Sequence, residues 1–147
     1  MKYFFLLLFS CSLLLASYSC KGFKNDVERI TQGYSEQDLK DFFEDSAKKY
    51  APKRMGPDLI LKDMSYDDHV LSLYYIIEEE GVYVDIMNCC EIVKKMRLND
   101  NYGDGTFLNL IKEAEITQRI VLKGNESGQT ASTFITPQEF EDAQRLK

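Results

Sequence analysis

The sequence predicts a single α+β domain in which two β-hairpins form a four-stranded antiparallel sheet with helices packed on one face. Apolar residues recur at helical spacing in three parts of the chain, and strand-like runs rich in β-branched and aromatic residues occur in four. Turn-forming residues lie between the first and second of these runs, and again between the third and fourth. The 147 residues suit one hydrophobic core.

The first helix is predicted to begin after Ser35. Ser35 is a favoured capping residue, and Asp38 stands three positions later, which resembles a capping box. Pro52 is expected to stop the helix. The apolar positions with helical spacing are Leu39, Phe42, Phe43, Ala47 and Tyr50.

The first hairpin is predicted from residues 58–64 and 69–77, with a turn at residues 65–68. In the first strand, Leu59 and Leu61 are expected on one face and Ile60 and Met64 on the other. In the second strand, alternation places four apolar residues on one face: Leu71, Leu73, Tyr75 and Ile77.

A longer helix is predicted over residues 84–98, where the apolar period changes from two to about 3.6. Residues 99–105 break it, and Thr106 is expected to cap a short helix that contains Phe107 and Leu110. The predicted apolar stripe of the longer helix consists of Ile86, Cys89, Cys90, Val93 and Met96.

The second hairpin is predicted from strands at residues 116–122 and 130–135, joined by a turn at residues 124–128. A terminal helix follows. Thr136 is expected to cap it, Pro137 suits the first helical position, and Glu139 completes a capping box.

The first nineteen residues are typical of a signal peptide. Lys2 is followed by an apolar stretch that is too short to span a bilayer, and small residues follow before Cys20. We therefore divide the chain into a signal peptide at residues 1–19, a lipidated N-terminus and tether at residues 20–34, and a single α+β domain at residues 35–147.

Cys20 directly after this cleavage point resembles the lipobox of bacterial lipoproteins, with Ser19 at position −1 and Ser17 where Leu is usual. The resemblance implies a diacylglyceryl group on the thiol and an acyl chain such as palmitate on the new amine, which together anchor the protein to a membrane. Some lipoproteins are retained in the inner membrane by an Asp directly after the lipidated cysteine. Lys21 stands at that position here, so we expect the outer membrane, with the domain facing the periplasm. The alternative is a secreted protein. The order of elements also resembles that of small envelope proteins of unassigned function.

Composition narrows the function. The net charge of −6 argues against a nucleic-acid partner, and one histidine excludes a multi-histidine metal centre. The loop at residues 99–105 resembles the start of a calcium loop. When Asp100 is aligned with position 1 of an EF-hand, position 12 is Ile111 where Glu is required, so the loop fails as an EF-hand. No cofactor or metal is expected. Cys89 and Cys90 are interpreted as buried thiols, because no CxxC pattern or nearby histidine accompanies them.

Two features give alternative functions. His69 follows Asp67 and Asp68, which leaves a small hydrolase using His69 as one alternative. Eight acids without a Lys or Arg lie between Asp63 and Val93, and an inhibitor or immunity-type protein that binds a cationic partner is the other. The candidate partner-binding residues, which we expect to be exposed, are Asp63, Asp67, Asp68, Glu78, Glu79 and Glu80.

The sequence thus predicts a lipid-anchored cell-envelope protein with a non-catalytic binding or structural role. Cys20 is its lipidation site, no catalytic residue is assigned, and a cationic protein is the expected partner.

Overall fold

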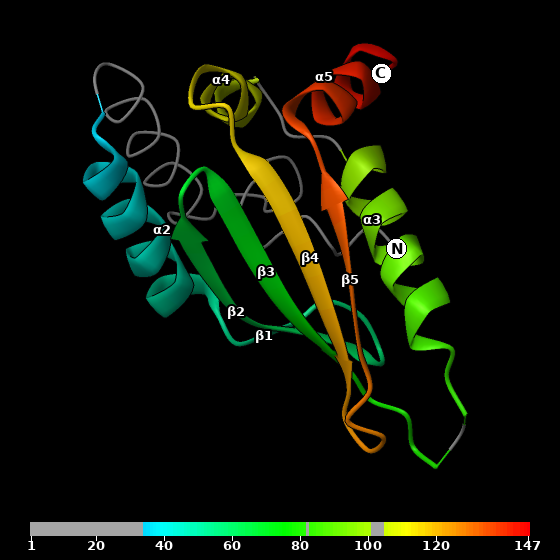
Figure 1. The fold of residues 1–147 in the computed structure, drawn as a ribbon. Coiled ribbons are helices and arrows are strands. Elements are labelled where there is room, and N and C mark those ends of the chain that lie inside the picture. Colours follow the sequence, from blue (N-terminus) through cyan, green and yellow to red (C-terminus); the bar gives the residue numbers. More distant parts are fainter. Residues whose placement is uncertain (1–33, 82, 101–104) are drawn as a thin grey trace, which may run out of the picture.

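The computed structural model describes residues 34–81, 83–100 and 105–147, which form an α+β fold with all strands in one sheet (Figure 1). None of the helices in these ranges has both the length and the apolar character needed to cross a membrane. The elements in chain order are α2 (Glu36–Tyr50), β1 (Lys53–Arg54), β2 (Leu59–Asp67), β3 (Val70–Ile77), α3 (Ile86–Asn99), α4 (Thr106–Glu113), β4 (Thr117–Gly124), β5 (Thr130–Ile135) and α5 (Pro137–Arg145).

The sheet has the strand order β1-β2-β3-β4-β5 and is mixed. Both predicted hairpins, β2–β3 and β4–β5, are present and antiparallel. The predicted antiparallel join between them is wrong, because β3 and β4 pair in parallel over their whole length. A parallel pair needs a long crossover, and the segment that contains α3 and α4 supplies it. The short strand β1, which pairs with β2, is a fifth strand that the sequence did not predict.

A β-bulge in β2 corrects the predicted faces of this strand. The register shifts between Leu61 and Asp63, so that Leu61 and Met64 both point into the core, where they are 1% and 3% exposed. The strand also runs on to Asp67, and the turn is formed by Asp68 and His69, which both have positive φ angles.

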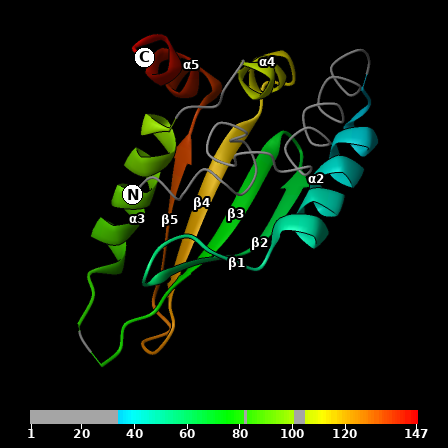
Figure 2. The same cartoon turned by 180° about the vertical axis from the view of Figure 1, so that it is seen from behind.

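The core lies on one face of the sheet, between α2 at one edge and α3 at the other (Figures 1 and 2). The ring of Phe43 on α2 stacks on Tyr66 of β2, with 5.2 Å between ring centroids. On α3, the buried Cys90 lies beside Ile120 of β4. The alternation predicted for β3 is confirmed, because Leu71, Leu73 and Tyr75 are all buried. The expected packing of helices on one face therefore holds for α2 and α3, while α4 and α5 lie at the end of the sheet.

The helix starts follow the capping signals in two of three cases. Capping boxes are present at Ser35 with Asp38 and at Thr136 with Glu139. The predicted cap at Thr106 is wrong, because the N-cap of α4 is Gly105, whose φ of 81° lies in the left-handed region that favours glycine.

Replacing Thr136 with Ala should lower the free energy of unfolding by about 1 kcal/mol, because the amide of Glu139 loses the acceptor that caps it. Urea unfolding measures the change. The control is Thr136→Ser, which keeps the hydroxyl and should unfold at nearly the urea concentration of the original chain. Equal losses in both variants would contradict the capping role.

Candidate functional site

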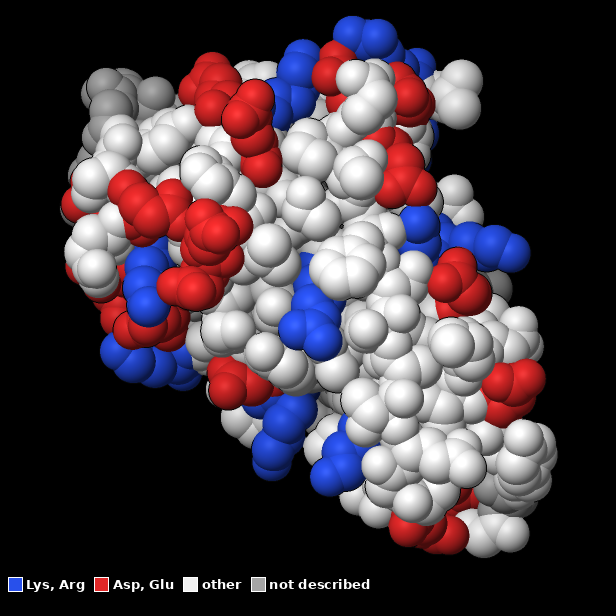
Figure 3. Space-filling view, in the orientation of Figure 1, with Lys and Arg blue, Asp and Glu red and all other residues white. Residues whose placement is uncertain are grey.

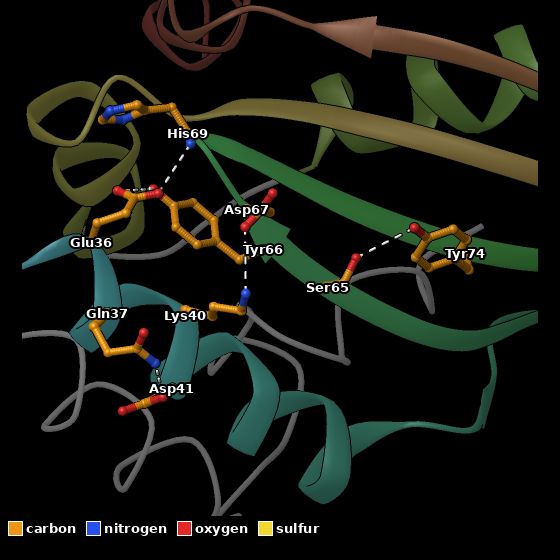
Figure 4. Close-up of polar contacts among 9 residues, drawn as sticks. All are labelled: Glu36, Gln37, Lys40, Asp41, Ser65, Tyr66, Asp67, His69 and Tyr74. Atoms are coloured by element: carbon orange, nitrogen blue, oxygen red, sulfur yellow. Dashed lines mark hydrogen bonds and ion pairs between the residues drawn. The ribbon is translucent and has the colours of Figure 1, made fainter.

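The turn between β2 and β3 is held against the start of α2 by Glu36 (Figure 4). The hydroxyl of Tyr66 donates to Glu36 Oε2 at 3.0 Å, and the backbone N–H of His69 donates to Glu36 Oε1 at 3.3 Å. Burial, followed by the hydrogen bond to Glu36, raises the pKa of Tyr66. The carboxylate of Glu36 therefore links the start of α2 to β2 and its turn, and each of its oxygens accepts one of these hydrogen bonds.

The ring of His69 is not oriented by a carboxylate. Its Nδ1 lies 2.8 Å from the carbonyl oxygen of Ala114, and this hydrogen bond raises the pKa of His69. Asp67 instead pairs with Lys40 at 3.4 Å. Within the described ranges, no hydroxyl or thiol is hydrogen-bonded to the ring, so the geometry lacks the nucleophile that a hydrolase needs.

The predicted acidic residues are spread over different surroundings. Glu78 accepts two hydrogen bonds from the guanidinium of Arg54, at 3.0 and 3.1 Å, and these lower its pKa. Asp63 is exposed and accepts the backbone N–H of Met64 at 2.8 Å. Glu80 is also exposed. The acids therefore do not form one surface of free carboxylates.

Glu79 is buried, with 6% of its surface exposed, which corrects the expectation that it is accessible. Its Oε2 accepts the backbone N–H groups of Glu126 and Ser127, both at 2.7 Å, and its Oε1 accepts the Ser127 hydroxyl at 2.8 Å. These bonds hold the β4–β5 turn against the end of β3. A Cβ at Gly124 would lie 2.5 Å from Glu79 Oε1, so a side chain there would displace this carboxylate from its donors.

Glu79→Gln should lower the stability of the chain at neutral pH, because a neutral amide oxygen is a weaker acceptor and its amino group meets donors. The hydrogen bond from the backbone N–H of Ser127 is the main cause of the lowered pKa of Glu79. The stability that the ionised Glu79 carboxylate contributes is therefore present at neutral pH and is lost as the pH falls below about 4.5. Urea unfolding should show a large difference in the free energy of unfolding between the original chain and Glu79→Gln at pH 7, and a small difference at pH 3. The control, Glu80→Gln, should change little at either pH.

The two adjacent cysteines differ in burial. Cys90 is buried, as predicted, and burial raises the pKa of its thiol to about 11. Cys89 is half-buried, and its pKa is also raised by burial. Both are free thiols. No group of three or more His, Cys, Asp or Glu side chains that could hold a metal occurs in the described part of the chain. Cys20 and residues 101–104 of the calcium-like loop lie outside it.

A buried arginine lies at the other end of α3, and the sequence analysis did not single it out. Arg97 is 4% exposed, and its Nε donates to Gln118 Oε1 at 3.0 Å. Nearby, Asp100 has a buried carboxylate oxygen without a hydrogen-bond partner among the described residues. Burial raises the pKa of Asp100 to about 7. The sequence carried one signal for this burial: the helical period of α3 places position 97 on its buried face.

Asp100→Asn should stabilise the chain more at pH 8 than at pH 5.5. The folded pKa lies above the ordinary value near 3.8, so the stability that the protonated carboxyl contributes is lost as the pH rises through about 7. Urea unfolding at both pH values measures the difference. A matched control is Asp68→Asn, whose side chain is exposed, and an equal pH effect there would contradict the assignment to Asp100.

The other face of the sheet is not crossed by any described helix, and Figure 3 looks onto it. Its residues are the strand positions that alternate with the core positions. Phe134 on β5 is 48% exposed, and four neighbouring apolar side chains are half-buried: Ile60, Tyr74, Ile76 and Val121. We call this surface the open sheet face.

Two basic residues of β4, Arg119 and Lys123, also lie on the open sheet face. Arg119 is opposite Phe134 and Ser72, and Lys123 is opposite Thr130 and Ile76. The Nε of Arg119 is buried without a hydrogen-bond partner among the described residues. Figure 3 shows that the middle of this face is mostly uncharged, with separate basic groups, and that acidic groups gather toward its periphery.

A hollow of about 440 Å³ lies between α2 and β2. Its lining is of mixed charge, because Glu44 and Lys48 of α2 face Lys62 and Asp63 of β2. This lining therefore favours neither sign of charge in a ligand.

Two solved structures are similar to this fold. A Pseudomonas aeruginosa protein inferred to be secreted matches with a TM-score of 0.52 and 13% identity, over 74% of this chain and 99% of its own. EpsS, the pilotin of the type II secretion system of Vibrio vulnificus, matches with a TM-score of 0.52 and 14% identity, over 71% and 94%. At these identities the likeness concerns the fold. No protein-family model matches the sequence, and neither does any curated protein.

Proposed function

We propose that this chain is a lipid-anchored envelope protein that binds a protein partner without catalysing a reaction. The observation that supports this most is the fold, since the described domain corresponds to nearly the whole length of a type II secretion pilotin. The lipobox-like segment ending at Cys20 adds an independent reason to place the protein at a membrane of the cell envelope.

The architecture between anchor and domain suits this role. Fourteen residues separate Cys20 from Ser35, where the domain begins. Multiple acyl chains hold a protein at a membrane stably, and such an anchor leaves the folded domain available to a partner. We place the protein at the outer membrane because Lys21 follows the cysteine.

The two alternative functions have less support. A hydrolase would use His69, but the Nδ1 of its ring is hydrogen-bonded to the backbone of Ala114. An inhibitor of a cationic protein would use the acidic segment, but Glu79 is buried and Glu78 is paired with Arg54.

Cys20→Ala should move the protein from the membrane fraction to the soluble fraction, because the acyl chains have no thiol to bind. Immunoblotting of separated fractions measures this, and mass spectrometry of the original protein should find the added acyl mass. The matched control is Cys11→Ala, which lies inside the predicted signal peptide and should leave fractionation unchanged. An unmodified mass at Cys20 would contradict the proposal.

A further inference from the structure

We propose that the open sheet face binds a segment of the protein partner that carries carboxylates beside apolar side chains. The inference rests on the proposed function, because it names the chemistry of the partner. It differs from the sequence prediction of a cationic partner, which concerned the acidic segment between Asp63 and Glu91.

The first reason is that Arg119 and Lys123 form no ion pair with any acid among the described residues. Other cations are paired: Lys40, Arg54 and Lys94 each form an ion pair with a carboxylate, and Arg54 does so on the same face, opposite Ile60. Arg119 and Lys123 form none within residues 34–81, 83–100 and 105–147, although the chain has a net charge of −6. The half-buried guanidinium of Arg119 is the costlier of the two to leave unpaired, because burial removes part of its contact with water.

The second reason is the apolar surface around these cations. Phe134 is nearly half exposed and lies opposite Arg119, and Val121 lies between Arg119 and Lys123 on β4. Aromatic residues and arginine are enriched in the centres of protein interfaces, where apolar contact supplies affinity and charges fix orientation. The combination fits a peptide segment better than it fits a small anion.

The spacing of the cations indicates the spacing of the acids. Arg119 and Lys123 are four residues apart on one strand, which corresponds to about 13 Å. A partner segment that follows β4 would therefore place two carboxylates about that distance apart, with apolar side chains between them to contact Val121.

A flat anionic membrane is a less suitable occupant. On the same face, β2 carries the exposed carboxylates of Asp63 and Asp67, which lie opposite Tyr74 and Val70. A membrane surface broad enough to contact β4 and β5 would bring anionic headgroups to these acids as well. A narrow segment along β4 and β5 avoids them.

The test is site-specific photo-crosslinking of the full-length chain in cells, with benzoylphenylalanine at position 134. The control position is Met87 on α3, which is also exposed, at 62%. We expect position 134 to crosslink a protein segment whose sequence, read by mass spectrometry, contains Asp or Glu near apolar residues. We also expect Arg119→Gln combined with Lys123→Gln to reduce the yield at least tenfold, and Lys95→Gln on the exposed side of α3 to leave it unchanged.

Unfolding of the double variant in urea checks that it is folded. Lys123→Gln alone provides a second variant, because this side chain is exposed, and it should reduce the yield severalfold. A crosslink to phospholipid, to a second copy of this chain or to a segment without acids would overturn the inference. An unchanged yield in the charge variants would do the same.

Failure of this inference is distinguishable from failure of the proposed function. If position 87 captures a specific protein while position 134 captures none, the open sheet face is not the docking surface and the binding role stands. If Cys20→Ala leaves the protein in the same fraction and neither position captures a protein, the proposed function fails with it.

Discussion

The parallel pairing of β3 with β4 is the constraint on which the rest of this structure depends. It joins the two hairpins into one sheet, and Leu71, Leu73 and Ile120 on the core face of this join are fully buried. Since parallel neighbours must be connected by a long crossover, the chain between them forms α3 and α4. Helices α2 and α3 both pack on one side of the sheet, and none of the described helices covers the open sheet face on the other side.

Internal hydrogen bonding explains why an acidic stretch of sequence does not become an acidic surface. A buried carboxylate is costly unless donors surround it, and Glu79 has the two amides and the hydroxyl of the β4–β5 turn. Glu36 has a similar role at the other end of β3, where Tyr66 and His69 donate to it. Both acids stabilise turns, and the burial of Glu79 removes it from any partner-binding surface.

The described domain is best understood through its fold and its surfaces. The fold is similar to that of a secretion pilotin and of a Pseudomonas aeruginosa protein inferred to be secreted. The candidate catalytic histidine is engaged with backbone at the edge of the domain. The open sheet face, by contrast, combines the exposed ring of Phe134 with Arg119, whose Nε has no hydrogen-bond partner in the described part of the chain, and interface centres are enriched in both residue types.

The sequence by itself determined the fold class, both hairpins, and the capping boxes at Ser35 and Thr136, because these depend on local periodicity and on contacts within four residues. Only the tertiary structure decided the parallel join, the bulge at residues 61–63 and the burial of Glu79. Each of these depends on partners more than ten residues away, such as Ser127 for Glu79. The open sheet face was also hidden from sequence, because alternation shows that a strand has two faces without showing which one the helices leave uncovered.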